Sequence, residues 1–519
     1  MSCRRVRWSA RLPLGRVTGV GTLSGSDRAS SGLAGLDEIL GGGFVSGRLH
    51  LVEGRPGTGK TTLGIHFVLA GRDQNEKVLY VSMSETRDEL HAVASAHGWS
   101  LEGVEMCELV PPDAEDGDGN RQTMFRSSEV ELGETMRLLC DEIERIDPAR
   151  LVLDSLSEMR LLAQNPLRYR RQIFALKHFL ARRNATVLVL DDMASNGHDL
   201  QLHSIVHGVL TLEELGLDYG AERRRLRVIK MRGVKYRGGY HDYAIRTGGL
   251  EVFPRLLVSE RPGTLPQEIV RSGSEQLDAL LGGGLRCGTS ALLVGPAGSG
   301  KSSVALSIAY NAAQKGECAN LYAFDEGTES IIARARGLGI ELEPLMASGE
   351  IVLHQINPAE MSPGEFTALV CRGVAERNST VVVIDSLNGY LQAMPQERFL
   401  ALEIHQLLTY LNQQRVLTIL VMAQHGLVGV VESPIDLSYL SDAVLLLRFF
   451  EAQGKVRKAI SVLKKRVGTH EDTIRELRLT AQGVQVGEPL TDFQGIMSGI
   501  PTYVGSQPLI QAAADDTRG

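Results

Sequence analysis

Short apolar runs alternate along the chain with segments of helical hydrophobic periodicity. LHLVEG (49–54) and KVLYVSM (77–83) flank the helical pattern TTLGIHFVLAGRD (61–73), and further apolar runs follow at 149–155 and 185–192. These runs are continuous and rich in Val and Leu, which is typical of parallel strands buried on both faces. Strands that alternate with helices predict an α/β fold, with a mostly parallel sheet flanked by helices.

The same order of elements occurs twice. GLDEILGGGFVSGRLHLVEGRPGTGKTT (35–62) is similar to QLDALLGGGLRCGTSALLVGPAGSGKSS (276–303), 241 positions later. An internal repeat of this length predicts two tandem domains of one fold, and 519 residues are too many for one ordinary core. The expected parts are a basic tail at 1–24, a first domain at 25–258 with an extra surface loop at 111–123, a second domain at 259–487 and a C-terminal tail at 488–519.

Each copy contains the motif G-x-x-x-x-G-K-[ST] between a predicted strand and a predicted helix. Glycines let the backbone N–H groups surround phosphate oxygens, and the N-terminus of the following helix adds partial positive charge. A glycine-rich turn that binds nothing is the alternative, but two matches in a repeat favour ATP binding. The predicted phosphate-binding residues are Gly54, Gly57, Thr58, Gly59, Lys60, Thr61 and Thr62 in the first copy, and Gly295, Gly298, Ser299, Gly300, Lys301, Ser302 and Ser303 in the second.

Magnesium is the cation expected beside the phosphates. The motif places the hydroxyls of Thr61 and Ser302 as Mg²⁺ ligands, and a second anchor is needed at the end of an adjacent strand. RLVLDS contains Asp154, and VVVIDS contains Asp385. A strand-end aspartate that only caps a turn is the alternative, but the same position in both copies favours metal binding.

A pair of carboxylates follows the next predicted strand of the second copy only. The first copy reads YVSMSET, with Ser84 and Glu85, where the second reads YAFDEGT, with Asp325 and Glu326. Ligands bind at the carboxyl ends of parallel strands, so these acids are candidate bases for the attacking water. Surface acids at a helix N-cap are the alternative. Because serine is not a base near neutral pH, we expect the first site to bind ATP and hydrolyse it slowly, with most chemistry in the second.

The composition argues against some classes of protein. The formal net charge of −7 disfavours a dedicated nucleic-acid binder. The six cysteines contain no C-x-x-C pair and are interpreted as reduced thiols. No run approaches the ~18 apolar residues of a membrane span. We therefore expect a cytoplasmic protein, with neither a membrane nor a nucleic acid as its partner.

The tandem LDxxLGGG…LVxGxxGxGK[TS] halves, each with acid after the next strand, resemble the KaiC family of the RecA superfamily. The resemblance covers about residues 25–505 and includes TDFQGIMSGIPTYVG at 491–505. It implies two RecA-like P-loop domains that bind ATP and Mg²⁺ and hydrolyse ATP. It also implies a homo-oligomer, a two-tiered hexamer with ATP between neighbouring subunits, and signalling or clock-type partners at the C-terminal tail.

The resemblance also assigns basic residues that would otherwise read as a solvated turn. In the family, a K-x-R motif near the end of each half reaches the nucleotide of the neighbouring subunit. It matches Lys230 with Arg232, and Lys464 with Arg466. A cation supplied in this way would stabilise charge on the transferring phosphoryl group.

The resemblance further implies autokinase activity in the second half. The family transfers phosphate to a Ser-Thr pair, which matches Ser438 and Tyr439, with the paired acids assisting. A tyrosine hydroxyl lies several ångströms further from its Cα, so Ser438 is the expected acceptor. Asp325 stands where the family has Glu, and its shorter arm is expected to weaken the transfer. A buried interface serine that is never phosphorylated is the alternative.

Two other functions fit parts of the sequence. A RecA-type motor on DNA shares the phosphate loop and the sheet, and its DNA contacts would come from the basic segments 222–238 or 168–172. A nucleotide-gated scaffold, in which ATP orders the protein with little turnover, is favoured by Ser84 in the first copy.

Overall fold

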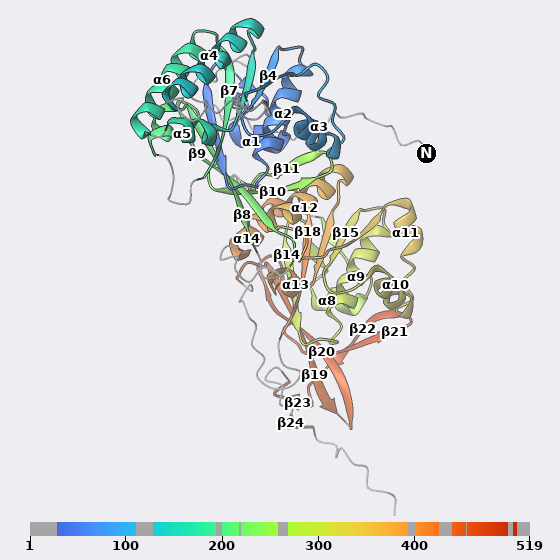
Figure 1. The fold of residues 1–519 in the computed structure, drawn as a ribbon. Coiled ribbons are helices and arrows are strands. Elements are labelled where there is room, and N and C mark those ends of the chain that lie inside the picture. Colours follow the sequence, from blue (N-terminus) through green and yellow to red (C-terminus); the bar gives the residue numbers. More distant parts are fainter. Residues whose placement is uncertain are drawn as a thin grey trace, which may run out of the picture. The chain divides into compact units, whose positions relative to one another are not determined.

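The computed structural model describes residues 28–109, 128–163, 165–193, 200–216, 220–257, 268–392, 400–424, 439–452, 454–496 and 502–505. The basic tail, the 111–123 loop, most of the C-terminal tail and Ser438 lie outside the described residues. The chain forms two compact units, one containing the central strands of the first repeat and one containing those of the second (Figure 1).

The first repeat is built on a nine-stranded sheet with the strand order β11-β10-β9-β8-β3-β7-β6-β4-β5. From β8 to β5 every neighbouring pair is parallel, as the continuous apolar runs predict. The strands are β3 (Leu49–Gly54), β4 (Val78–Ser82), β5 (Glu105–Glu108), β6 (Arg150–Asp154), β7 (Thr186–Asp192), β8 (Gly208–Leu215), β9 (Arg223–Met231), β10 (Tyr240–Arg246) and β11 (Gly249–Phe253).

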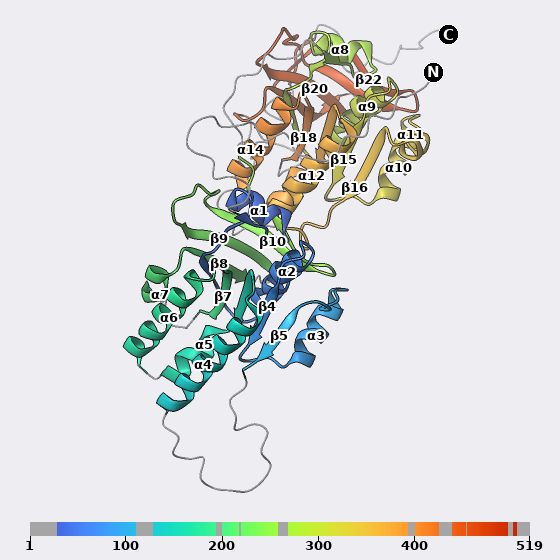
Figure 2. The same cartoon turned by 90° about the horizontal axis from the view of Figure 1, so that it is seen from above.

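Helices cover both faces of this sheet (Figure 2). Leu49 and Leu51 of β3 pack in one core cluster with apolar side chains of α4, α5 and α6. On the other face, α2 contacts β3, β4, β6 and β7. The helices are α1 (Ala34–Leu40), α2 (Lys60–Arg72), α3 (Arg87–Ala96), α4 (Ser128–Ile146), α5 (Leu156–Ala163), α6 (Pro166–Ala181) and α7 (Leu200–Ile205).

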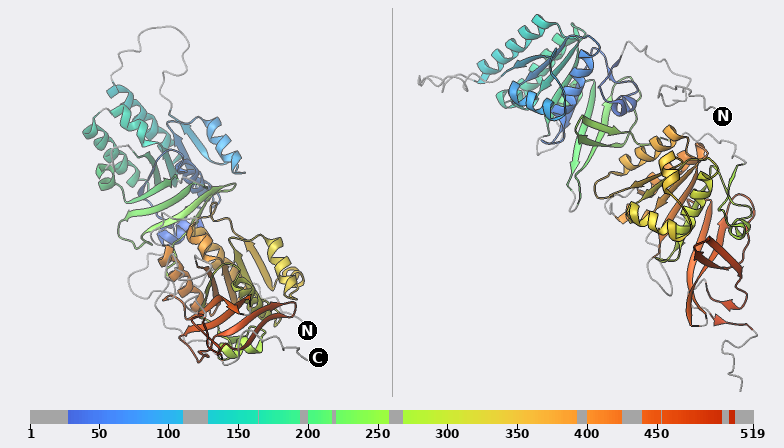
Figure 3. Two further views of the ribbon diagram at one scale, coloured as in Figure 1. Left: turned by 90° about the horizontal axis from the view of Figure 1, so that it is seen from below. Right: turned by 90° about the vertical axis from the view of Figure 1, so that its right-hand side faces the viewer.

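The second unit repeats the design with the strand order β16-β15-β17-β18-β14-β19-β20-β21-β22. The pairs from β16 to β19 are parallel, and β19 to β22 form an antiparallel extension at one edge, red in Figure 3. The strands are β14 (Ser290–Gly295), β15 (Ala319–Ala323), β16 (Ile351–Gln355), β17 (Val381–Asp385), β18 (Leu417–Ala423), β19 (Ala443–Ala452), β20 (Lys455–Lys465), β21 (Arg475–Thr480) and β22 (Gly483–Pro489).

The second sheet is also covered on both faces. Alternate residues of β14 point to opposite layers: Ala291 and Leu293 pack with α9, and Leu292 and Val294 pack with α12, α13 and α14. Within the described part of the chain, no helix has both the length and the apolar character that a membrane crossing requires. The helices are α8 (Glu275–Leu280), α9 (Lys301–Ala313), α10 (Thr328–Gly337), α11 (Glu343–Ser348), α12 (Pro363–Arg377), α13 (Leu387–Gln392) and α14 (Leu400–Gln413).

Among the described residues, three short antiparallel pairs complete the structure, two of them at equivalent places in the two repeats. They are β1 (Arg28–Ala29) with β2 (Phe44–Val45), β12 (Ile269–Val270) with β13 (Leu285–Arg286), and β23 (Phe493–Gln494) with β24 (Thr502–Tyr503). The predicted fold class is therefore confirmed as two tandem RecA-like domains, each with a mostly parallel sheet between helices.

A fully buried arginine anchors the strand that ends at Asp154. Arg150, the first residue of β6, is 1% exposed; its guanidinium pairs with Glu76 and donates to Ser30 O at 2.6 Å and Gln74 Oε1 at 3.0 Å. The sheet register places Val381 at the equivalent position of the second unit.

We predict that Arg150→Val destabilises the first unit by about 3 kcal/mol, because it leaves buried acceptors without a donor. Urea unfolding followed by tryptophan fluorescence measures this, since both tryptophans, Trp8 and Trp99, lie in the first half. Arg145→Val removes an exposed pair with Glu142 and should cost less than ~1 kcal/mol. Equal losses in the two variants would contradict the anchoring role of Arg150.

Candidate active site

The phosphate loop of the first unit connects β3 to α2. Gly54 is the last residue of β3, and Lys60 is the first of α2. Between them, Gly57 and Gly59 have φ angles of 86° and 85°, in the left-handed region that favours glycine. The Thr58 hydroxyl is buried and donates to Arg55 O at 2.8 Å. The loop thus has the strand–loop–helix context that the motif requires, with its N–H groups at a helix N-terminus.

The ammonium group of Lys60 lies inside this loop. It donates to the carbonyl oxygens of Gly54 and Arg55, each at 3.0 Å, and pairs with Asp192 Oδ1 at 2.8 Å. Asp192 is the last residue of β7, which pairs with β3 so that Gly54 and Asp192 are partners in the register. The register therefore places an acid beside the phosphate loop that the sequence analysis did not identify as a site residue.

The second phosphate loop connects β14 to α9 with the same geometry. Gly298 and Gly300 have φ angles of 76° and 105°, and Lys301 is the first residue of α9. The Lys301 ammonium donates to Pro296 O at 2.8 Å. Burial lowers the pKa of this lysine to about 8, an effect that the nearby Asp385 opposes. The buried Ser299 hydroxyl has no hydrogen-bond partner among the described residues.

The predicted magnesium ligands are brought together in both units. Thr61 Oγ1 donates to Asp154 Oδ2 at 2.8 Å, and the same carboxylate oxygen accepts from Tyr80 Oη at 2.6 Å. In the second unit the Ser302 hydroxyl acts on the Asp385 carboxylate and lowers its pKa. Burial raises the pKa of both aspartates, while these hydroxyl donors oppose the shift. A hydroxyl and a carboxylate beside a phosphate loop are oxygen ligands of the kind that Mg²⁺ takes together with nucleotide phosphates, so the residues fit this metal.

Glu85 is the first acid after β4. Its backbone is fixed by Ser82, whose hydroxyl donates to Glu85 O at 2.6 Å and accepts from Glu85 N at 2.9 Å. Its Oε2 atom is buried and has no hydrogen-bond partner in the described structure. Burial, and then the negative charge of Asp154, raises the pKa of Glu85. An unpartnered carboxylate oxygen with a raised pKa is suited to accept a proton.

The two acids of the second unit are held differently. Asp325 accepts a hydrogen bond from the Ser386 hydroxyl, one residue after the metal-site Asp385. Glu326 pairs with Arg334 at 2.8 Å. Both acids thus have partners, whereas Glu85 keeps a free oxygen. The second unit therefore has two acids, but the single acid of the first unit has fewer side-chain contacts that compete with proton acceptance.

The two K-x-R motifs lie at the other end of each sheet from the phosphate loop. Lys230 donates to His203 O, and Arg232 donates to Ser204 O at 2.6 Å. In the second unit Lys464 donates to Ser441 O at 2.9 Å, and Arg466 donates to Tyr439 O at 2.6 Å. These carbonyls precede the first residues of β8 and β19, the strands parallel to β3 and β14.

Backbone hydrogen bonds fix this position. The N–H of Arg232 donates to His207 O, and the N–H of His207 donates to the carbonyl of Leu49, the first residue of β3. The phosphate loop follows the last residue of β3, about 17 Å away at the rise of a β-strand. The motif therefore lies beyond the reach of the phosphate loop of its own unit.

Three site residues were missed by reading the sequence. They are Asp192 beside Lys60, Tyr80 on Asp154, and Arg334 on Glu326. The first had a usable signal, because Asp192 ends an apolar run just as Asp154 does. Tyr80 and Arg334 had none, since their contacts depend on packing between elements.

Binding of MgATP to the second site should take up protons at pH 8. With a pKa of about 8, roughly half of the Lys301 side chains are neutral at that pH, and neighbouring phosphates favour the charged form. The predicted uptake is therefore about half a proton per site, measurable by calorimetry in buffers of different ionisation enthalpy.

The proton measurement needs a background in which only the second site binds nucleotide, which Lys60→Ala provides. Lys301→Arg is the control, because a guanidinium stays protonated throughout this range. An uptake that persists unchanged in Lys301→Arg would show that the proton goes to another group.

Comparisons with known proteins find relatives over most of the chain. The "Circadian clock protein KaiC3" of Synechocystis sp. is 24% identical over 487 residues, which cover 92% of this chain and 95% of that protein. The "Circadian clock oscillator protein KaiC" of Thermostichus vulcanus is 25% identical over 484 residues, covering 91% of each chain. Its Nostoc sp. counterpart is 25% identical over 497 residues, covering 93% of each. A model of the KaiC ATPase family matches residues 29–256 and 270–491, most of the chain, and this protein therefore belongs to the KaiC family.

Proposed function

We propose that this KaiC-like ATP-binding protein binds MgATP in both halves, hydrolyses it, and uses its second half to phosphorylate Ser438. The observation that carries the proposal is the pairing of a phosphate-loop hydroxyl with a strand-end aspartate in each unit: Thr61 with Asp154 and Ser302 with Asp385. When bound there, Mg²⁺ would neutralise charge on the β- and γ-phosphates. Lys60 and Lys301 would bind the same phosphates. The proposed domains are 25–258 and 259–487.

Each site is completed by a neighbouring copy in this proposal. Within one unit the K-x-R cations lie at the amino end of the central strand, and the phosphate loop follows its carboxyl end. Lys230 and Arg232 can therefore act on a phosphoryl group only from another copy, and the same holds for Lys464 and Arg466. Identical copies joined head to tail form a ring when the rotation closes. We propose a homo-oligomer, with a hexamer as the form that the family resemblance implies.

Glu85 is the proposed base of the first site. Its buried, unpartnered Oε2 and its raised pKa support proton acceptance from the attacking water, although Ser84 stands where the second half has the first acid of its pair. In the second site Glu326 would have to leave Arg334, or Asp325 would have to leave Ser386, before either accepts a proton. Slow hydrolysis in the first site stays a prediction, based on the acid that Ser84 replaces. The surroundings of Glu85, in contrast, favour turnover there.

Autophosphorylation rests on the second unit. Tyr439, beside the proposed acceptor Ser438, is 58% exposed, and its carbonyl oxygen accepts from Arg466 of the K-x-R motif. Tyr439, the residue after the proposed acceptor, thus contacts one of the cations that we assign to the neighbouring nucleotide. In this arrangement one copy supplies the hydroxyl while the next supplies the nucleotide and its acids.

The remaining proposals concern location and partners. We propose a cytoplasmic protein whose C-terminal tail contacts signalling partners, as the clock-protein names of the relatives suggest. A DNA-dependent ATPase is the second candidate, and saturable DNA binding that follows the ATP state would favour it. A scaffold with little turnover would instead bind ATP and release almost no phosphate.

We predict that Glu85→Gln slows phosphate release from the first site about 100-fold, the loss expected for a general base. The measurement uses a Lys301→Ala background, in which only the first site binds ATP well, and ATP affinity should stay unchanged. Asp88→Asn removes a nearby exposed acid and should have little effect. Wild-type turnover in Glu85→Gln would remove Glu85 from the mechanism, and rapid release in the background itself would exclude a purely structural first site.

Ser84→Glu restores the missing acid of the first site. If one acid limits turnover there, this variant should release phosphate faster than the wild-type first site in the same background. Unchanged turnover would show that the serine is not the limit.

Phosphosite mapping tests the kinase proposal. After incubation with ATP, mass spectrometry should find phosphate on Ser438 in the wild type and in Lys60→Ala, but not in Lys301→Ala or Ser438→Ala. The reason is that only the second phosphate loop serves the transfer. Active hydrolysis without phosphate anywhere in 432–442 would refute the autokinase proposal and leave the ATPase proposal standing.

A further inference from the structure

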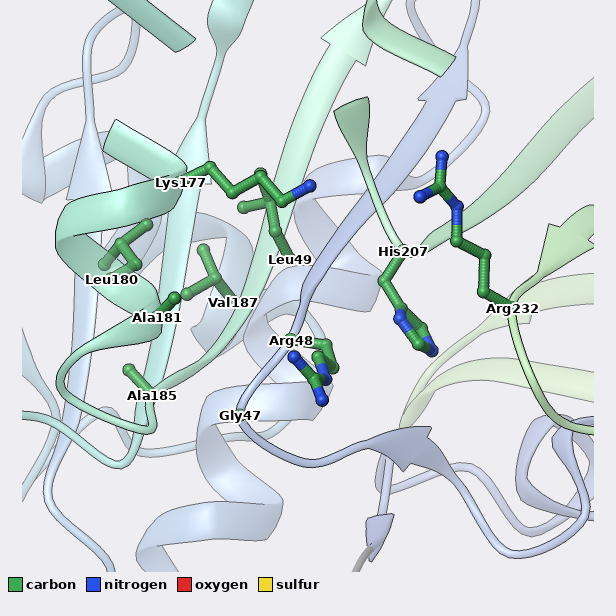
Figure 4. Close-up of a pocket in the computed structure, with 10 residues that line it drawn as sticks. All are labelled: Gly47, Arg48, Leu49, Lys177, Leu180, Ala181, Ala185, Val187, His207 and Arg232. Atoms are coloured by element: carbon green, nitrogen blue, oxygen red, sulfur yellow. The ribbon is translucent and has the colours of Figure 1, made fainter. Parts of the chain in front are cut away.

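A cavity of about 170 Å³ lies in the first unit at the amino ends of β3 and β7, away from the phosphate loop. Figure 4 shows the side chains of Arg48, Lys177, His207 and Arg232 around it. They come from four elements: the segment before β3, helix α6, the segment before β8 and the segment after β9. None of its ten lining residues, all in the described part of the chain, is acidic. We call these four side chains the cation pocket.

The second unit has the same backbone at this place. His207 N donates to Leu49 O and Asp442 N to Ser290 O, at 2.8 and 2.9 Å. Arg232 N likewise donates to His207 O, and Arg466 N to Asp442 O. The two halves can therefore be compared position by position.

The side chains at these positions differ between the halves. The positions of Arg48, Lys177 and His207 are occupied in the second half by Thr289, Leu408 and Asp442. Arg466 there lies 3.5 Å from the Asp442 carboxylate, which balances its charge. The first half thus has three additional basic side chains where the second half has an acid and no further cation.

The cations of the first half affect one another. The pKa of His207 is lowered by burial and then by the charges of Arg48 and Arg232, and the pKa of Lys177 is lowered by burial and then by Arg232 and Arg48. Lys177 and Arg232 donate to the carbonyl oxygens of Ile205 and Ser204, both at 2.6 Å. A carbonyl at a helix end carries only a partial charge, so these bonds orient the cations without neutralising them.

One polar atom of the cluster is left without a partner. His207 Nε2 is buried and makes no hydrogen bond within the described residues. Together with the repulsion among the basic side chains, this makes the pocket suited to an anion. The cavity is about ten times the volume that one water molecule needs, which leaves room for a hydrated oxyanion.

We propose that the cation pocket binds a phosphate group, with Arg48, Lys177 and His207 as binding residues particular to the first half. A phosphate oxyanion matches the set, because it offers several acceptors to guanidinium, ammonium and imidazole donors at once. The group comes from free inorganic phosphate or from the nucleotide of a neighbouring copy. The inference depends neither on autokinase activity nor on the number of subunits, since the pocket lies within one unit.

The test is binding of inorganic phosphate to the full chain carrying Lys60→Ala and Lys301→Ala, which disable both phosphate loops. Calorimetry or phosphorus NMR should still find one phosphate per chain. Lys177→Leu and His207→Asp, each added to this background, copy the residues of the second half and should weaken binding at least about tenfold. The first removes a charge-assisted contact, and the second places a negative charge beside the phosphate.

Arg171→Leu is the matched control, because it removes one cation from an exposed position of the same helix. It should leave phosphate binding unchanged, and circular dichroism checks that every variant is folded. No phosphate bound in the double phosphate-loop variant would overturn the inference. Equal weakening by Arg171→Leu and Lys177→Leu would also overturn it, because the attraction would then be non-specific.

A second arm identifies the source of the group. In the chain with intact phosphate loops, phosphate binding is measured with and without a non-hydrolysable ATP analogue. Only the phosphate that Lys177→Leu removes is counted, because phosphate held in the loops themselves does not depend on Lys177. Displacement of that phosphate by the analogue indicates that the pocket receives a neighbour's nucleotide, and phosphate that stays bound indicates a site for the free ion. Loss of ATP hydrolysis plays no part in either readout, so failure here is distinct from failure of the proposed function.

Discussion

The buried contact between a strand-end aspartate and the hydroxyl of the phosphate loop is the interaction on which the site depends. Asp154 can remain a carboxylate in its buried place because Thr61 and Tyr80 donate to it, which offsets part of the cost of burying a charge. The contact requires that β6 and β3 end at the same edge of the sheet. Parallel pairing through β7 provides this, and a shift of one residue would turn the aspartate to the other face.

Much of this could be predicted from the sequence, because the relevant signals are local. Continuous apolar runs predicted the central strands, and the repeat with its two phosphate-loop motifs predicted two domains of one fold. Strand-end position predicted Asp154 and Asp385, which the structure places against Thr61 and Ser302. These features follow from residues within one strand and its adjoining loop, so they need no knowledge of packing.

The features that escaped prediction depend on contacts between distant elements. The pairing of Lys60 with Asp192 exists because β7 lies beside β3, an order that the apolar pattern does not encode. The sequence suggested a weak site around Glu85 because the neighbouring acid is missing. The structure adds that Glu85 is partly buried and that its Oε2 atom has no partner among the described residues, which bears equally on its chemistry. From the sequence, Asp325 and Glu326 were the better candidate bases. In the structure their carboxylates are engaged by Ser386 and Arg334, which makes them less available to accept a proton.

The central strand of each unit separates two groups of proposed phosphate-binding residues, which therefore cannot contact the same nucleotide. In the first unit the phosphate loop follows the last residue of β3, and the cations of the K-x-R motif and of the cation pocket surround its first residue. A strand is nearly inextensible, so no side-chain motion brings these groups onto the same phosphate. If the residues at both ends of the strand bind phosphate, each unit must bind two phosphate groups: one in its own loop and one at the opposite edge of the sheet. The first half has the larger excess of positive charge at that edge, so the repeats have diverged there as well as at the acids beside the loop.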